Sequence, residues 1–201
     1  MTFAADTELI ENFLNGDINS FNRLVHRWQN RLYSFAYRYV MNEQDAKEIV
    51  QSALIKAYKN LNRLKEPEKF SSWIFQITVN LCKDHLKRNS KNRYAELTDD
   101  ILTNGNSSNL NNAVISDSDP VSNINQLDLS SIIKRSLAQL SEEQRVVIIM
   151  KEYEGFKFSE IAEMLNVPLS TVKSRMYYGI TQMQKILKKL NIDEEVVFNE
   201  M

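Results

Sequence analysis

Apolar residues recur at steps of three and four along most of the chain, which is the period of an amphipathic helix. One apolar stripe runs through residues 21–39 and a second through residues 46–61. After a break at residues 66–68, a third stripe runs through residues 70–81. Each stripe can bury one face of a helix against the others. The pattern predicts a small helical domain in the first half of the chain.

The second half shows shorter helical segments with local start and stop signals. Ser141 and Gln144 have the spacing of a capping box, in which each side chain bonds the backbone N–H of the other residue. Residues 158–175 are typical of two helices separated by a turn at Asn166, a residue type that tolerates left-handed backbone. We expect Ser170 to cap the second helix. This pattern predicts a helix-turn-helix, whose second helix normally enters the DNA major groove by its N-terminal residues.

Residues 95–128 differ from the segments on either side. They are rich in Asn, Ser and Asp, and they contain no aromatic side chain and no sustained period. Such a segment buries too little apolar surface to offset its conformational entropy. We therefore expect an all-α protein with two small helical domains, at residues 1–94 and 129–190, joined by a flexible acidic linker at 95–128. A short helix is expected around residues 124–127, and residues 191–201 form an acidic tail.

Composition narrows the class of protein. The chain has 201 residues, of which 43% are hydrophobic, enough for two cores. Its 4 Gly and 3 Pro argue against a turn-rich β protein. The single cysteine, Cys82, excludes an intramolecular disulfide and a cysteine-based zinc site. No apolar run approaches the roughly 20 residues that span a bilayer, and residues 1–6 do not resemble a signal peptide. We expect a cytoplasmic protein without direct membrane insertion.

The net charge of −1 hides an uneven distribution. Residues 20–93 carry 15 basic and 6 acidic side chains, and residues 130–190 carry 10 and 6. The remaining segments contain acidic side chains and no basic ones. Two basic blocks separated by an acidic spacer favour a polyanionic partner. On charge alone, chance and ordinary solvated helix faces remain an alternative.

A polar ridge lies opposite the third apolar stripe. It consists of Gln76, Asn80, Lys83, Asp84, Lys87 and Arg88. Cations can neutralise phosphates, and amides can hydrogen-bond the edges of exposed bases. A polar ridge taken alone is more often an ordinary solvated helix face. Whether this one binds nucleic acid must therefore be judged from the order of the neighbouring motifs.

The motifs resemble one known family. Residues 44–51, 70–80 and 84–88 resemble, in order and spacing, region 2 of the extracytoplasmic-function (ECF) sigma factors, and residues 140–175 resemble their region 4. Three departures are visible. Lys47 stands where the family usually has an acid, and Ser141 stands where a proline is common. Residues 177–179, Tyr-Tyr-Gly, replace a stretch that is often more basic.

The resemblance implies that the chain directs core RNA polymerase to promoter DNA and assists melting. The implied polymerase contacts are Asp45, Glu48, Gln51 and Ser52. The implied contacts with the −10 element are Asn62, Lys65, Lys69, Gln76, Asn80, Lys83, Asp84, Lys87 and Arg88, with residues 62–69 as the base-catching loop. The implied contacts with the −35 element are Ser170, Thr171, Lys173, Ser174 and Arg175. ECF factors are commonly held by an anti-sigma factor, although no residue here identifies one.

Other chemistry finds no support in the sequence. His26 and His85 lack ligand-like spacing, Cys82 reads as a small core residue, and there is no Gly-rich phosphate loop or nucleophile motif. We expect no catalysis, metal, cofactor or small-molecule substrate. A helix-turn-helix regulator that acts without replacing the sigma subunit would explain the second domain but leave residues 73–88 without a purpose. A helical interaction scaffold would not explain the polar array at residues 170–175.

Overall fold

A computed structural model describes residues 3–104 and 129–189, with side chains described for 6–91 and 131–189. Both ranges are helical and contain no strand, which confirms the all-α prediction. Residues 105–128 and 190–201 lie outside the described residues. Most of the expected linker, the short helix expected around residues 124–127 and the acidic tail therefore fall outside them as well.

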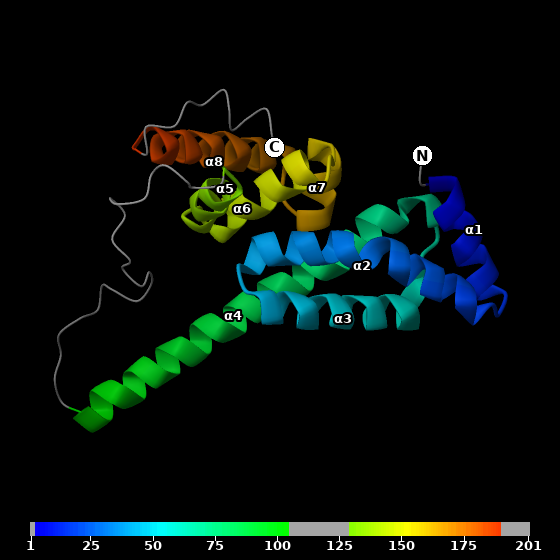
Figure 1. Cartoon of the computed structure of the whole chain (residues 1–201), viewed down its shortest axis with the longest axis horizontal. Coiled ribbons are helices and arrows are strands. Elements are labelled where there is room, and N and C mark those ends of the chain that lie inside the picture. The colour runs from blue at the N-terminus through cyan, green and yellow to red at the C-terminus, as the bar shows by residue number, and fades with distance from the viewer. Residues whose placement is uncertain (1–2, 105–128, 190–201) are drawn as a thin grey trace.

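The first range forms the first domain and the second range forms the second domain (Figure 1). The first domain comprises α1 (Phe3–Leu14), α2 (Ile18–Val40), α3 (Glu43–Asn60), the 3-10 turns η1 (Leu61–Arg63) and η2 (Pro67–Lys69), and α4 (Phe70–Asn104). The second domain comprises α5 (Leu129–Ala138), α6 (Glu142–Ile148), the π-helical segment η4 (Ile149–Tyr153), α7 (Phe158–Leu165) and α8 (Leu169–Lys189).

Helices α2, α3 and α4 pack together through the three predicted stripes. Polar caps set where two of them begin. Asp17 accepts a hydrogen bond from the backbone N–H of Asn19 (3.0 Å), and Asn42 accepts one from that of Asp45 (3.0 Å). Such caps satisfy N–H groups that have no partner within the helix. The helical bundle predicted from periodicity is therefore present, and α1 covers one end of α2.

Helix α4 continues ten residues beyond the boundary expected at residue 94 and ends at Asn104. Its C-terminal half projects away from the rest of the protein (Figure 1). Residues 95–104 contain neither glycine nor proline, and Gly105 is the next glycine in the sequence. Because glycine commonly follows the last turn of a helix, the helix continues until that residue type appears.

The second domain confirms the capping box and the predicted turn. Ser141 Oγ accepts the backbone N–H of Gln144, and Gln144 Oε1 accepts that of Ser141, both at 3.3 Å. Asn166 ends α7 in the left-handed conformation, with φ 53°. The expectation that Ser170 caps α8 is wrong. The helix begins at Leu169, two residues earlier than a Ser170 cap would place it, and the Pro168 carbonyl accepts the N–H groups of Thr171 (2.9 Å) and Val172 (3.2 Å).

Helices α6 and α8 approach each other closely at Gly179. A Cβ atom at this position would lie 2.8 Å from Ile148 Cδ1 and 3.3 Å from Gln144 Cβ. A side chain here would have to displace Ile148, which is fully buried. The glycine therefore fixes how closely the helix-turn-helix packs on α6.

The two domains pack against each other and share one hydrophobic core. Phe75 of α4 contacts Phe35 of its own domain and Phe156 of the second domain, in both cases with ring centroids 5.1 Å apart. Arg145 of α6 donates a hydrogen bond from Nη1 to the carbonyl of Tyr39 at the end of α2 (2.8 Å). The relative position of the domains, which the sequence left to the linker, is thus set by direct contacts.

Candidate nucleic-acid and polymerase interfaces

The predicted polar ridge lies along one face of α4, and we call it the α4 ridge. Of its six residues, five are exposed and Lys83 is half-buried. Beside it lies a groove of about 390 Å³, lined by Lys56, Leu81, Asp84, Lys87, Arg88 and Lys91. Four of these side chains are cationic, so the groove is suited to a phosphate backbone.

Sequence reasoning missed two members of this cationic groove. Lys91 stands one helical turn beyond Lys87, so the same helical spacing could have found it. Lys56 comes from α3 and joins the groove because α3 packs beside α4. No local signal in the sequence connects Lys56 with the α4 ridge.

The expected base-catching loop corresponds to η1, η2 and the residues between them. Asn62, Lys65 and Lys69 are all exposed there. Lys69 Nζ lies 2.8 Å from Glu66 Oε2, and this carboxylate raises the pKa of the lysine. A cavity of about 300 Å³ lies beside the loop, and its lining includes Lys65, Lys69, Trp73 and Gln76. The structure thus brings the loop residues together with the first turns of α4.

The predicted polymerase contacts all lie on α3, but their side chains differ in how exposed they are. Glu48, Gln51 and Ser52 are exposed, and Glu48 accepts a hydrogen bond from Gln44 Nε2 (3.1 Å). Asp45 is only partly exposed, and its Oδ2 lies 2.9 Å from His85 Nε2 of α4. Asp45 therefore also joins α3 to α4, a role that its position in the sequence did not indicate.

The predicted −35 residues occupy the first two turns of α8. Ser170, Lys173 and Ser174 are exposed, while Thr171 and Arg175 are half-buried. A shallow pocket of about 430 Å³ is formed with α6, lined by Ser141, Glu143, Gln144, Ser170, Thr171, Ser174, Arg175 and Tyr178. The polar start of a recognition helix is thereby presented at the surface, as direct readout of the major groove requires.

Two tyrosines extend this surface beyond the predicted set. Tyr177 and Tyr178 are 67% and 61% exposed, and their ring centroids lie 5.5 Å apart. Tyr178 shares the α8 pocket with Ser174 and Arg175. A sequence signal was available, because residues 177–179 were the stretch that departs from the more basic pattern of the family.

The described side chains offer little for catalysis or metal binding. Cys82 is fully buried, as predicted for a core residue, and burial raises the pKa of its thiol, which opposes the thiolate form a nucleophile needs. Among described residues, no group of three or more His, Cys, Asp and Glu could hold a metal ion. None of the described helices combines the length and apolar character that crossing a bilayer requires.

Two family models match this chain. The model of Sigma-70 region 2 matches residues 24–92, and that of Sigma-70 region 4 matches residues 130–183. The two matches fall on the first and second domains, and together they cover more than half of the chain.

Curated relatives match over most of their length. The ECF RNA polymerase sigma factor SigW of Bacillus subtilis is 29% identical over 182 residues, which are 90% of this chain and 96% of the relative. The ECF RNA polymerase sigma-E factor of Escherichia coli K12 is 31% identical over 172 residues, which are 86% of this chain and 88% of the relative.

Solved structures share the fold. The sigma factor RpoE in its complex with the anti-sigma factor NepR from Bartonella quintana has a TM-score of 0.62 and 23% identity, covering 85% of this chain and 98% of that one. CnrH in its complex with the cytosolic domain of CnrY also has a TM-score of 0.62, with 20% identity, covering 92% of this chain and 98% of that one.

Proposed function

This chain belongs to the ECF RNA polymerase sigma factors, and we propose how its two domains divide the work of promoter recognition. The first domain contacts core polymerase through α3 and the −10 element through the α4 ridge and the η1–η2 loop. The second domain reads the −35 element as duplex through the start of α8. The observation that supports this proposal is that one chain presents two polar surfaces of different kinds, a cationic groove along α4 and the exposed polar start of α8.

The α4 ridge suits a strand that has been separated from its partner. Its exposed amides, Gln76 and Asn80, stand at the end nearer the loop, and the cations Lys87 and Arg88 stand two to three turns further along. Opening DNA costs a few kcal/mol for each unstacked step. Capture of the exposed bases by amides and of their phosphates by cations offsets that cost.

The polymerase contact falls to the exposed residues of α3. Glu48, Gln51 and Ser52 point away from the core and are available to a partner. Ile55, at 48% exposed, stands one turn beyond Gln51 and adds apolar area to the same face. Interfaces of this kind combine an apolar centre with a polar rim, so α3 offers both parts.

The remaining assignments follow from this role. The polymerase carries out RNA synthesis, and the chain contributes no catalytic group of its own. It acts in the cytoplasm, where promoter DNA and polymerase are found.

Two structural relatives were solved in complexes with an anti-sigma factor or a cytosolic partner domain, which supports an anti-sigma factor as a further partner. The regulator that leaves the sigma subunit in place is not favoured, because family membership covers the first domain as well.

A pair of variants tests the assignment of the α4 ridge. Asn80→Ala removes hydrogen bonds without removing charge, so it should spare duplex binding and reduce strand opening. Lys87→Ala combined with Arg88→Ala removes two phosphate contacts, so it should weaken both, most strongly at low salt, where these charges are least screened. Permanganate footprinting of unpaired thymines reports opening, and a mobility-shift assay of the holoenzyme on the same promoter reports binding. Equal losses in both assays for Asn80→Ala, or no loss in either, would show that this face does not capture single strands.

A further inference from the structure

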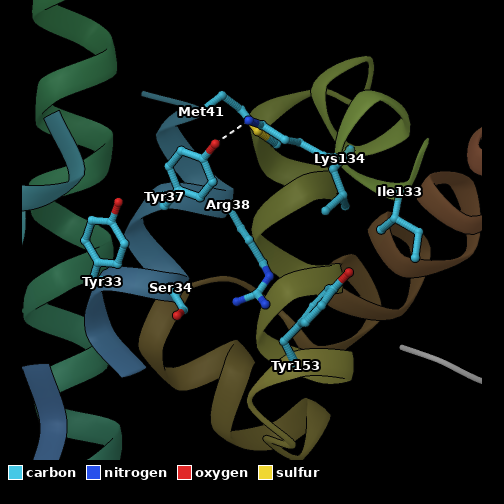
Figure 2. Close-up of a pocket in the computed structure, with 9 residues that line it drawn as sticks. Tyr33, Ser34, Tyr37, Arg38, Met41, Ile133, Lys134 and Tyr153 are labelled. Carbon is cyan, nitrogen blue, oxygen red and sulfur yellow. Dashed lines mark hydrogen bonds between the residues drawn. The ribbon is translucent and has the colours of Figure 1, made fainter. Parts of the chain in front are cut away.

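A cavity of about 380 Å³ lies where α2, α5 and η4 meet (Figure 2). It shares no lining residue with the cationic groove of α4 or with the α8 pocket. Its lining combines aromatic, apolar and cationic side chains: Tyr33, Ser34, Tyr37, Arg38, Met41, Ile133, Lys134, Leu137 and Tyr153. None of these nine described residues is acidic. Small-molecule sites have volumes of roughly 300–1,000 Å³ and occur preferentially at domain interfaces, so the cavity has the size and place of such a site.

One end of the cavity presents donors from both domains. Lys134 of α5 donates a hydrogen bond to the hydroxyl of Tyr37 on α2 (Figure 2). Because the hydroxyl accepts this bond, it keeps its own proton to donate, and the ammonium has two further N–H groups. Lys134 is exposed, so solvent and solutes reach this end. The pair is therefore arranged to bind an anionic group.

A second cation stands at the opposite end. The guanidinium of Arg38 points toward Tyr153 and lies 4.2 Å from the centroid of its ring (Figure 2). Burial raises the pKa of Tyr153, against the opposing charge of Arg38, so its hydroxyl stays protonated at neutral pH and can donate. The charge of Arg38 also reaches Glu154, but that carboxylate is already held by Arg31, whose Nε lies 2.6 Å from Glu154 Oε2. Neither Arg38 nor Lys134 takes part in an ion pair among the described residues.

The rest of the lining is apolar or aromatic. Ile133 and Leu137 of α5 belong to the shared hydrophobic core, and Met41 packs against it. The rings of Tyr33 and Tyr37 are nearly parallel, at 9°, with centroids 6.1 Å apart. Aromatic side chains pack well on other rings, and cations bind over ring faces. This part of the cavity therefore favours a flat apolar body.

We propose that the cavity binds a small organic diacid with a flat apolar body, with one acidic group at Lys134 and Tyr37 and the other at Arg38. Each acidic group meets a cation, whose charge-assisted hydrogen bonds are stronger than neutral ones. The body removes apolar side chains from water. This inference goes beyond the proposed function, because the binding needs neither DNA nor polymerase.

Three probes with the same naphthalene ring test the proposal: 2,6-naphthalenedicarboxylate, 2-naphthoate and the uncharged 2-naphthalenemethanol. Isothermal titration calorimetry on the full-length chain, without DNA or polymerase, measures the Kd of each. The diacid should bind about fivefold more tightly than the monoacid, because it contacts both cations at once. The alcohol should bind most weakly.

Lys134→Gln removes one cation from an exposed position, so the fold should be retained. In this variant the diacid should lose about fivefold in affinity and bind no better than the monoacid. Arg38→Gln should give the same result from the other end. Lys151→Gln is the matched control, because Lys151 also lies over an aromatic ring, that of Phe158 (5.2 Å), but outside the cavity. It should leave the preference for the diacid unchanged.

Three results would overturn the proposal. They are no saturable binding of the diacid below about 1 mM, equal affinity for the three probes, and an undiminished preference for the diacid in Lys134→Gln. Circular dichroism melting shows whether each variant is folded, and if Arg38→Gln unfolds, the result for Lys134→Gln decides. A failure here leaves the DNA assignments standing, because the variants of the α4 ridge test them separately.

Discussion

Each domain has a buried charged residue among those that the structure describes, Asp6 in the first and Arg145 in the second, and the two are satisfied in different ways. Asp6 of α1 is 4% exposed and bonds within the first domain, accepting the Trp28 indole N–H (3.2 Å) and pairing with Arg27. Arg145 of α6 is 9% exposed and donates to four carbonyl groups. Three of these carbonyls belong to the second domain, and the fourth is that of Tyr39 in the first domain.

This difference shows that the first domain is self-contained, whereas the second is partly completed by its neighbour. The lengths of the helices support the same conclusion. Helix α2 has 23 residues, while α6 and α7 have 7 and 8. Helices this short gain most of their stability from tertiary contacts. The second domain therefore depends more on individual anchors, and the first on a distributed core.

Arg145→Ala should give the largest effect. It removes one donor from each of four carbonyl groups, of which that of Leu137 keeps the Leu140 N–H (3.2 Å), and removal of one partner from a buried charged network costs about 3–5 kcal/mol. Asp6→Ala, the matched change in the first domain, breaks two bonds and should cost about 1–3 kcal/mol. Urea unfolding of both full-length variants measures the difference. Equal losses of unfolding free energy would contradict the conclusion that the second domain depends more on a single anchoring residue than the first.

The proposed DNA surfaces of the two domains also differ, because the second domain concentrates its polar groups on two turns of α8. Arg175→Ala should weaken binding to a −35 duplex by about 1–3 kcal/mol if a base is read. Lys185→Ala, an exposed cation further along α8, is the control and should have little effect. Fluorescence anisotropy on cognate and scrambled duplexes separates the cases, because a phosphate contact would weaken both equally.

A single change on the α4 ridge should matter less. Lys87 shares its groove with Lys56, Arg88 and Lys91, so Lys87→Ala should cost no more than about 1 kcal/mol and lower the salt dependence by about one phosphate contact. Titration of a single-stranded −10 oligonucleotide at several salt concentrations measures both. A loss as large as that of Arg175→Ala would show that the ridge also relies on one residue.

The smallest effect concerns pH. Burial raises the pKa of the Glu154 carboxyl above its usual 4.5, against the opposing effect of Arg31 and Arg38. A proton therefore binds the chain with its two domains packed together more tightly than a chain in which this carboxyl is solvated. The packing of the two domains should gain stability as the pH falls through the raised pKa toward 4.5, and lose it as the pH rises. Scattering across this range should show compaction in acid, and Glu154→Gln should flatten the change.

Much of the fold could be predicted because its signals are local. The apolar stripes of residues 21–39, 46–61 and 70–81 depend on the period of a single helix. The capping box of Ser141 and Gln144 and the left-handed Asn166 depend on backbone bonds within a few residues. Even the error at Ser170 is a displacement of two residues, because α8 begins at Leu169 and the Pro168 carbonyl accepts its first N–H groups.

The candidate surfaces were predictable to the same extent. Residues on one helix face, such as Asn80 and Lys87, follow from spacing, and the resemblance to a family supplied their roles. Lys56 could not be found this way, because it reaches the groove from α3. The contact of Asp45 with His85 likewise depends on how α3 packs against α4.

The sequence by itself thus determined the three helical stripes of the first domain, the capping box of Ser141 and Gln144, the helix-turn-helix and the resemblance to the family. Tertiary structure alone decided how the domains meet. Arg31 and Glu154 are separated by 123 positions, and Arg145 and Tyr39 by 106. Neither helical periodicity nor a helix cap connects residues so far apart in the sequence. Their contact depends on which apolar faces pack against each other once each helix has formed.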